Sequence, residues 1–293
     1  MTNTAHHFSI GAIDVSLRSD CRLFIDEYVS LYGPYRRSEP GNDPIEITIN
    51  SRGRFPWRRG PYVIQGPDGE GFEVRRRYEV LPHLEWTINW HVIRRRNEFA
   101  QLHAAALEID GHALMMPGNP GSGKSTTAAG LLARGWRYLS DEFALIDPSS
   151  LEVQPFPRAL CIKQPSFSVI DGLRLPLHKR TPYRKAAKGR VAFLNPLEVR
   201  PDATGRRSHV RWVVFPQYVA GATPAMESLP RSQAAYELAR QCFNFPAYNG
   251  RVVRIVADIV RQAECYRLIA GNIGATCDLI ESRLLPQIRR KAG

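Results

Sequence analysis

The segment Gly118-Asn-Pro-Gly-Ser-Gly-Lys-Ser125 places the strongest constraint on this 293-residue chain. Its spacing, G-x-x-x-x-G-K-[ST], is that of a loop that cradles phosphate groups. The apolar run 113–116 before it fits a buried strand, and residues 128–133 after it are good helix formers. Glycines let several backbone N–H groups point at one phosphate, and the following helix adds its positive end. A glycine-rich turn without a ligand is the alternative, but strand, turn and helix together favour a nucleotide phosphate site.

The loop pattern also assigns roles to side chains. Lys124 is expected to reach the β- and γ-phosphates, and Ser125 is expected to offer its hydroxyl to Mg²⁺. The loop therefore predicts a nucleoside triphosphate and Mg²⁺; the expected nucleotide is ATP, although the sequence does not identify the base. The residues expected to contact the nucleotide are Gly118, Asn119, Pro120, Gly121, Ser122, Gly123, Lys124, Ser125 and Thr126.

The apolar stretch that begins at Trp136 is predicted to be a strand that ends in two adjacent acids, Asp141 and Glu142. Mg²⁺ takes one or two carboxylates and completes its octahedron with water and phosphate oxygens. An exposed pair of acids in a turn is the alternative. Because the pair follows so soon after the phosphate loop, we expect Asp141 and Glu142 to join Ser125 as metal ligands.

Composition is that of a globular protein that can bury a substantial core as one large domain or two smaller ones, with 43% apolar residues and 10% aromatics. No apolar run approaches the length of a membrane span, and the first residues lack a signal-peptide layout. The five cysteines are scattered and include no C-x-x-C. They favour reduced thiols, core packing and a cytoplasmic location over disulfides or zinc, and no membrane partner is expected.

The net charge of +12 raises the question of a nucleic-acid partner. The arginines, however, occur in short clusters without a recognition module, which is more typical of solvated faces, so no nucleic-acid partner is expected. The chain has only six lysines. One is Lys124, and four lie in the later segment 163–188, where they suggest point charges near phosphates.

Elements expected before residue 100 form a small α/β region. Strands are expected at 8–17 and at 45–49, a helix at 20–32, and a hairpin from 62–64 and 72–74. A largely buried helix is expected from Pro82 to about residue 96. Its Trp86 and Trp90 could line a ligand, but core packing is the favoured interpretation.

Later elements are expected to build the nucleotide-binding region. Strands are predicted at 102–109, 113–116, 210–215 and 265–269, and from Trp136 to the acid pair, with a tight turn at Asp110-Gly111. The apolar run 159–162 leads to Lys163. Helices are predicted after the phosphate loop, ending at 134–135, and at 230–243, 252–261 and 273–290, with Val253, Val256 and Val260 together on the third of these four. Residues 165–189 are expected to be an irregular loop, either a mobile cover over the phosphates or a solvated linker.

The run LHAAALEIDGHALMMPGNPGSGKSTTAAGLLARGWRYLSDEFALID, 102–147, resembles the core of HPr kinase/phosphorylase. That family has a histidine before a turn, then strand, phosphate loop, helix, R-G-[HW]-R and a small residue before two acids. Its fold is similar to that of phosphoenolpyruvate carboxykinase. The resemblance extends over nearly the whole chain to the group called HPr kinase-related kinases. The matching segments are LEWTINW, PRALCIK, KGRVA, VVFP, FNF and CYRL.

This resemblance implies transfer of phosphate to a serine or threonine hydroxyl of a small protein or peptide. Asp141 matches the acid–base aspartate, Glu142 the neighbouring metal-associated acid, Ser125 the loop metal ligand and His103 the histidine near the phosphates. Catalytic roles are therefore expected for Asp141, Lys124 and His103. A lone strand histidine, taken without the resemblance, is better interpreted as a satisfied core residue.

Two departures from the family pattern limit what the resemblance implies. The second acid is a glutamate, and ALCIKQPSF, with Lys163, replaces a segment that supplies another glutamate in HPr kinase. Dephosphorylation and HPr itself as the acceptor are therefore not implied. Arg158, Lys163 and Lys188 are further candidates for phosphate or substrate contacts. A homo-oligomer would match the family, although no residue here marks an interface.

The sequence thus predicts a mixed α/β fold: a small N-terminal α/β region, 1–97, and an HPr kinase-like P-loop kinase domain with a mixed sheet, 98–293. Two other functions remain open. One is a kinase for a small-molecule alcohol, and the other is a nucleotide-binding regulatory module with little turnover.

Overall fold

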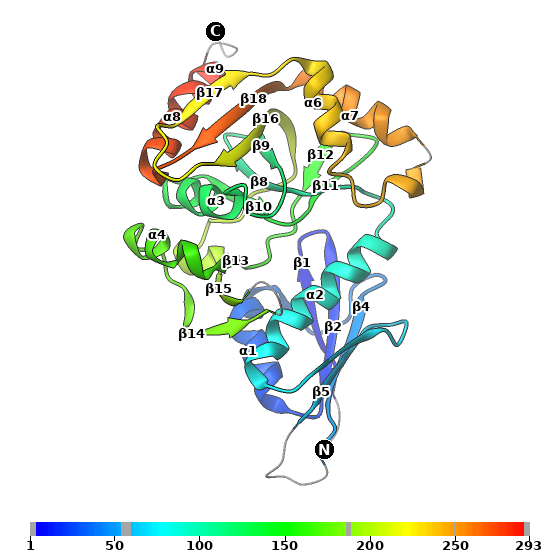
Figure 1. Ribbon diagram of the computed structural model, residues 1–293. Helices are drawn as coiled ribbons and strands as arrows, with labels where there is room; N and C mark the ends of the chain where they lie inside the picture. The colour runs from blue at the N-terminus through cyan, green and yellow to red at the C-terminus, as the bar shows by residue number, and fades with distance from the viewer. Residues whose placement is uncertain (1–3, 54–59, 186–188, 249, 290–293) are drawn as a thin grey trace. The chain divides into compact units, whose positions relative to one another are not determined.

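The computed structural model describes residues 4–53, 60–185, 189–248 and 250–289 (Figure 1). The chain divides into two compact units. Unit 1 comprises Met1–Arg96, Cys161–Pro165 and Leu177–Asn195, and unit 2 comprises Asn97–Leu160, Ser166–Pro176 and Pro196–Gly293. The chain therefore returns twice to unit 1 after leaving it at residue 96. The sequence-based division at 97/98 does not foresee these returns and stays a prediction about domains.

Unit 1 contains a six-stranded sheet in the order β3-β1-β2-β4-β5-β6. Alternate residues of its central strand β4, Ile45, Ile47 and Ile49, are buried and form part of one apolar face. The helices α1 (Arg22–Tyr32) and α2 (Arg77–Arg95) pack on the sheet. The strands are β1 (His6–Ile10), β2 (Ile13–Ser19), β3 (Arg36–Arg37), β4 (Ile45–Ser51), β5 (Tyr62–Gln65) and β6 (Gly71–Val74).

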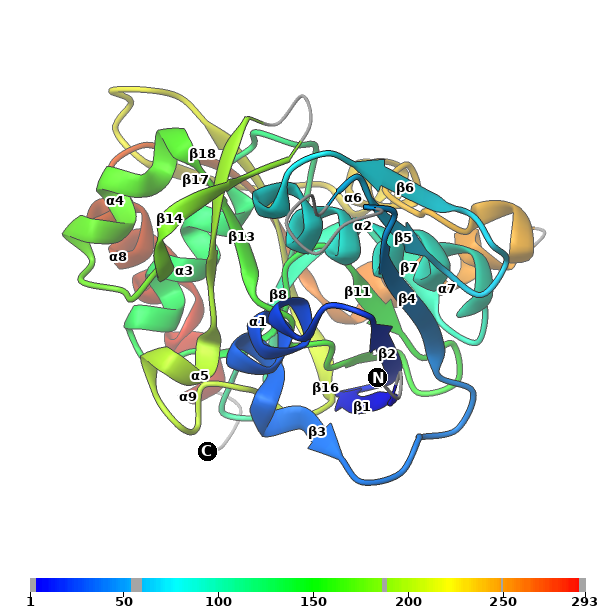
Figure 2. The same cartoon turned by 90° about the horizontal axis from the view of Figure 1, so that it is seen from below.

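A three-stranded sheet, in the order β13-β15-β14, contains the segments that return to unit 1. Its strands are β13 (Leu160–Lys163), β14 (His178–Arg184) and β15 (Arg190–Leu194). The Tyr183 hydroxyl donates to Glu27 Oε1 at 2.7 Å, which ties β14 to α1. The helix α2 contacts β14 as well as β5 and β6 (Figure 2).

Several expectations for unit 1 were wrong. The strand predicted at 8–17 is two strands, β1 and β2, joined by a turn in which Gly11 has a φ of 64°. The helix predicted from Pro82 begins at Arg77, after a cap in which the Arg76 N–H donates to Glu79 Oε2 at 3.1 Å and the Glu79 N–H donates to the Arg76 carbonyl oxygen at 2.9 Å. Trp86 and Trp90 are not core residues, since they are 41% and 43% exposed.

Unit 2 is built on a nine-stranded sheet whose main path is β10-β8-β9-β16-β12-β11-β7, with β18 beside β16 and β17 beside β18. The strands β9, β10, β16 and β18 all run in one direction, so their carboxyl ends share one edge. The strands are β7 (Ala100–Leu102), β8 (Ala104–Ile109), β9 (His112–Pro117), β10 (Arg137–Ser140), β11 (Ala144–Ile146), β12 (Glu152–Gln154), β16 (Ser208–Tyr218), β17 (Ala225–Ser228) and β18 (Glu264–Ala270).

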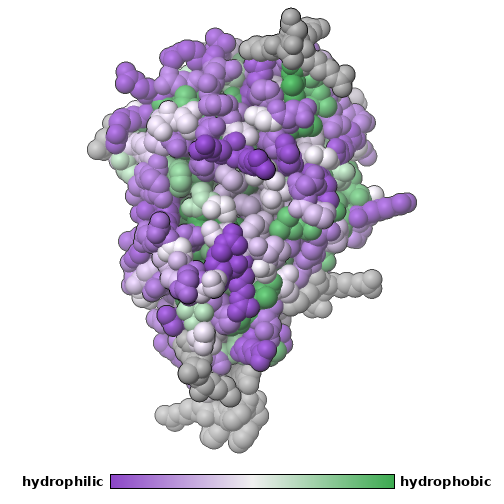
Figure 3. All heavy atoms as spheres, turned by 180° about the vertical axis from the view of Figure 1, so that it is seen from behind, coloured by the Kyte–Doolittle hydropathy of each residue, from purple (hydrophilic) through white to green (hydrophobic). Residues whose placement is uncertain are grey.

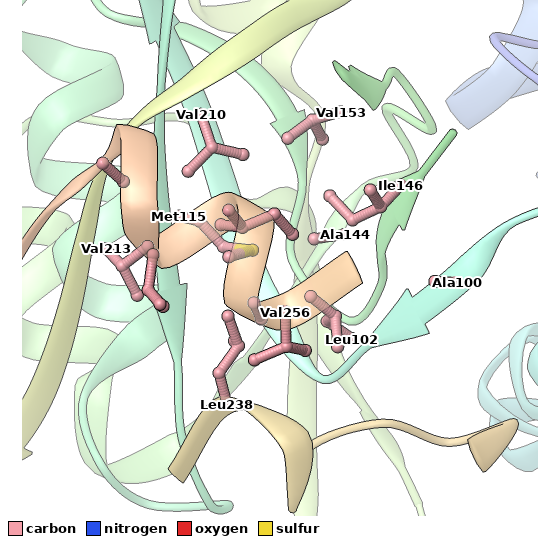
Figure 4. Packing of buried hydrophobic residues seen from close by; sticks show 14 of the residues in the cluster. Ala100, Leu102, Met115, Ala144, Ile146, Val153, Val210, Val213, Leu238 and Val256 are labelled. Carbon is pink, nitrogen blue, oxygen red and sulfur yellow. The ribbon is translucent and has the colours of Figure 1, made fainter. Parts of the chain in front are cut away.

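Helices cover both faces of this sheet (Figure 1). On one face, Met115 and Val213 pack with Leu238 of α6 (Arg231–Ala239) and Val256 of α7 (Arg251–Gln262), as Figure 4 shows. The other face is covered by α3 (Lys124–Ala133) and α8 (Ile273–Leu284). The shorter helices are α4 (Phe167–Gly172), α5 (Pro196–Val199) and α9 (Pro286–Arg289). Mixed sheets with helices confirm the predicted α/β class.

The tight turn at Asp110-Gly111 is confirmed, with φ values of 48° and 80° in the hairpin of β8 and β9. The predicted strand 102–109 is interrupted, however, at His103. The strand predicted to end in Asp141 and Glu142 is confirmed as β10, whose last residue is Ser140. The helix predicted at 273–290 stops at Leu284, before Pro286, and the one predicted at 230–243 stops at Ala239.

Three further expectations concern single segments and residue types. The segment 165–189 is not irregular throughout, because it contains α4 and β14. Val253 is 56% exposed and does not join Val256 and Val260 in the core. Each of the five cysteines is a free thiol; Cys21, Cys265 and Cys277 are buried, whereas Cys161 and Cys242 are half-buried.

One face of the molecule is mainly polar. On the face drawn in Figure 3, hydrophilic residues predominate and hydrophobic ones form small patches. Across the described part of the chain, none of the helices has the length and apolar character needed to span a bilayer.

Candidate functional site

The phosphate-loop segment joins β9 to α3, as predicted. Gly121 and Gly123 have φ values of 93° and 96°, a conformation that side-chain-bearing residues rarely adopt. A Cβ on Gly118 would also lie 2.9 Å from Ser122 Oγ. The glycines are therefore required by the curl of the loop itself, which places backbone N–H groups at the beginning of a ten-residue helix.

Lys124 is the first residue of α3, and its side chain turns back into the loop. It is only 6% exposed, and its Nζ donates to the carbonyl oxygens of Gly118 and Asn119, the latter at 3.2 Å. A positive charge is thus held inside the curl of the loop. This is where a nucleotide's distal phosphates need a cation.

Ser125 and Asp141 meet directly: the serine Oγ donates to Asp141 Oδ2 at 2.8 Å. The other carboxylate oxygen, Oδ1, is buried and has no hydrogen-bond partner among the described residues, as is also true of Ser122 Oγ. Burial, together with the smaller effect of the neighbouring Glu142 charge, raises the pKa of Asp141 to about 6. The Ser125 hydrogen bond and the charge of Lys124 act against this shift.

These groups fit a magnesium ion. A buried carboxylate oxygen without a partner, next to a serine hydroxyl, is a pair of hard oxygen donors. No group of three or more His, Cys, Asp or Glu side chains arranged for a metal occurs within the described ranges. Where Mg²⁺ also binds phosphate oxygens and water, it needs only one or two protein carboxylates.

His103 lies in the interruption between β7 and β8, and the acid pair lies in the interruption between β10 and β11. The pairing of Ser140 with Ala106, and of Ala144 with Leu102, shows that these two interruptions face each other in the sheet. The carbonyl oxygen of His103 accepts a hydrogen bond from the Gly118 N–H at 3.3 Å. The sheet thus brings His103, the acid pair and the first glycine of the loop together.

Two residues that received no role from the sequence complete this region. The ring of Phe243 lies 5.1 Å, centroid to centroid, from both His103 and Phe143. The backbone carbonyl oxygen of Gln241 accepts a hydrogen bond from the His103 backbone N–H at 2.8 Å. The side-chain Nε2 of Gln241 donates to Asn119 Oδ1 at 3.4 Å. In the sequence, the signal for Phe243 is the run FNF, which begins at this residue and forms part of the family resemblance.

Of the remaining residues predicted to contact phosphate or substrate, some lie in this region and others do not. Arg158 is 7% exposed, lies over the Phe156 ring at 4.7 Å, and lowers the pKa of Asp141 by its charge, so it belongs to this region. The Thr126 hydroxyl is 2.9 Å from Ser166 Oγ. Lys163 is part of unit 1, and its role stays a prediction. Lys188 lies outside the described residues.

Comparison with known proteins shows partial matches to kinases. A stretch of 112 residues is 36% identical to an HPr kinase/phosphorylase of Xanthomonas oryzae pv. oryzae and covers 37% of this chain and 34% of that protein. A stretch of 81 residues is 37% identical to an HPr kinase/phosphorylase of Xylella fastidiosa and covers 27% of this chain and 24% of that protein. The chain thus spans about a third or less of the length of these relatives. No family model matches. Over the matched stretch, the chain is related to the HPr kinase/phosphorylases.

Proposed function

We propose that this chain is an ATP-dependent phosphotransferase that moves the γ-phosphate to a serine or threonine hydroxyl of a small protein or peptide. The observation that carries the proposal is the contact of Ser125 with the buried carboxylate of Asp141, beside the loop that encloses Lys124. Kinship with proteins named HPr kinase/phosphorylase supports a kinase-like function. The acceptor and the direction of the reaction are part of the proposal.

In the proposed reaction, the acceptor oxygen forms a bond to the γ-phosphorus while the bond from that phosphorus to the β,γ-bridging oxygen breaks, releasing ADP. The acceptor hydroxyl proton passes to Asp141 Oδ1, the carboxylate oxygen that has no other partner among the described residues. Lys124 and the loop N–H groups bind the phosphates and neutralise their charge. Ser125, with Glu142 or with Asp141 through water, would hold Mg²⁺, which supplies further charge neutralisation when bound.

The first test is transfer of labelled phosphate from ATP to a library of serine- and threonine-containing peptides, with a metabolite extract in parallel. Label in peptides supports the proposal. Label only in small alcohols would identify the other kinase class. ATP binding without transfer or hydrolysis would instead indicate a regulatory nucleotide-binding module.

The transfer rate is expected to depend on pH through Asp141. Its raised pKa, about 6, means that the carboxylate becomes protonated as the pH falls through 6, and a protonated carboxyl cannot accept the acceptor proton. We expect kcat/KM to be level above about pH 7 and to fall roughly tenfold per pH unit below about 6. A profile that stays level down to pH 4.5 would contradict this role for Asp141.

A further inference from the structure

The sheet places the acid pair and the end of β16 on opposite sides of the phosphate loop. The loop follows β9, and the strand order β10-β8-β9-β16 puts β10, which leads into Asp141, on one side and β16 on the other. The carboxyl ends of β9, β10 and β16 share one edge. This inference rests on the proposed function: with the γ-phosphate near Asp141, the nucleoside leaves the loop over β16.

Tyr218 is the last residue of β16 and touches the loop. Its backbone N–H donates to the Ser122 carbonyl oxygen at 3.1 Å. A Cβ added to Gly123 would lie 3.3 Å from Tyr218 Cβ, so the tyrosine is packed against the loop's last glycine. Yet Tyr218 is 53% exposed. A large aromatic side chain is therefore fixed at its base and open to solvent beside the phosphate site.

The backbone that follows Tyr218 is held just as closely. The Val219 N–H donates to Ala270 O at 2.9 Å, and the Ala222 N–H donates to Val219 O at 3.2 Å. A Cβ on Gly271 would lie 1.9 Å from Ala222 O, so this turn packs directly on the end of β18. The position of Tyr218 is thus set from both sides, and little backbone freedom is left to lose when a ligand binds.

We propose that Tyr218 forms the platform on which the purine base of the nucleotide stacks. Its phenol ring offers a rigid aromatic surface in the direction that the phosphate site leaves open. Stacking uses the face of the base, which every purine has, so Tyr218 contributes affinity without selecting between adenine and guanine.

The test compares two ligands that share phosphates but differ in the base. Calorimetric titrations with MgATP and with magnesium tripolyphosphate are carried out on the wild type, Tyr218→Ala, Tyr218→Phe and Tyr236→Ala. Tyr236 is the matched control, an exposed tyrosine (64%) on α6. We expect Tyr218→Ala to weaken ATP binding roughly tenfold or more and to leave tripolyphosphate binding unchanged. Tyr218→Phe and Tyr236→Ala are expected to bind both ligands as the wild type does.

Two results overturn the platform: unchanged ATP affinity in Tyr218→Ala, or an equal loss for ATP and tripolyphosphate in a variant that retains the wild-type Tm. In both cases the wild type still binds ATP, and the proposed function stands. A wild type that binds neither ligand would instead overturn the proposed nucleotide site, and the platform with it.

Discussion

Asp141→Asn is expected to lose phosphate transfer by about 10²- to 10⁴-fold, the usual contribution of a positioned general base. Asparagine keeps an oxygen that can accept the Ser125 hydrogen bond, now 2.8 Å long, and keeps the size of the side chain. It cannot take the acceptor proton, and it is a weaker magnesium ligand than a carboxylate. Single-turnover transfer from labelled ATP to the acceptor peptide measures the loss.

The same substitution is expected to make the protein more stable. The pKa of Asp141 is raised from 3.8 to about 6 in the folded chain, so the neutral carboxyl is favoured by folding. Its stabilising contribution is complete below pH 3.8 and is lost as the pH rises through 6. At pH 8 the buried charge therefore lowers the free energy of unfolding, by at most about 3 kcal/mol from a shift of roughly two pKa units. Asp141→Asn removes that cost, and its Tm at pH 8 without nucleotide or metal should exceed the wild-type Tm by several degrees.

Asp147→Asn is a control for which the expected change in Tm has the opposite sign. Hydrogen bonds from the Ser149 hydroxyl and N–H lower the pKa of Asp147, so its carboxylate stabilises the fold above the unfolded pKa. This variant should have a slightly lower Tm at pH 8 and the wild-type transfer rate. If Asp141→Asn retained transfer at near the wild-type rate, Asp141 would not be the base. A Tm lower than that of the wild type for Asp141→Asn would show that the charge of Asp141 does not lower the free energy of unfolding.

The local parts of the site could be predicted from the sequence because local chemistry decides them. The phosphate loop and the Asp110-Gly111 turn depend on glycines and on residues close to them in the chain. The alternating isoleucines of β4 are a similarly short signal. None of these features needs a partner far away in the sequence.

The arrangement around the loop could not be predicted because it depends on strands that change partners. The run 102–109 looks like one strand, yet β7 pairs with β11 whereas β8 pairs with β9 and β10. The change of partner falls at His103. The change from β10 to β11 falls at the acid pair for the same reason. Hydrophobic periodicity records burial, and it does not record which strand lies alongside.

Aromatic contacts between residues far apart in the chain could not be predicted from the sequence for a related reason. Phe243 contacts His103 and Phe143 from a segment that follows α6, 140 residues after the histidine and 100 after the phenylalanine. Trp86 and Trp90 show the opposite error. Their helical spacing suggested core, but Trp86 stacks on Phe72 at 4.6 Å and Trp90 donates to Glu70, and both remain partly exposed.

Lys124→Met is expected to reduce transfer about 10²-fold or more, comparable with the loss of one preorganised donor to a developing charge. Methionine has nearly the length of lysine and suits a position that is 6% exposed, so packing is largely preserved while the charge is removed. ATP affinity should fall as well, because the phosphates lose the cation that the loop encloses. Titrations with MgATP and single-turnover transfer measure the two effects separately.

Two further variants distinguish the effect of the charge at Lys124 from the effect of the net charge of the chain. Lys124→Arg keeps the charge, but a planar guanidinium with five donors is a poor replacement for an ammonium held by the carbonyl oxygens of Gly118 and Asn119. It should therefore lose transfer nearly as fully as methionine does. Arg254→Met removes an exposed charge from α7 of the same unit and should retain wild-type binding and transfer. Equal losses at Lys124 and Arg254 would mean that ATP responds only to the net charge of the chain, whereas a loss confined to Lys124 ties the phosphates to the loop.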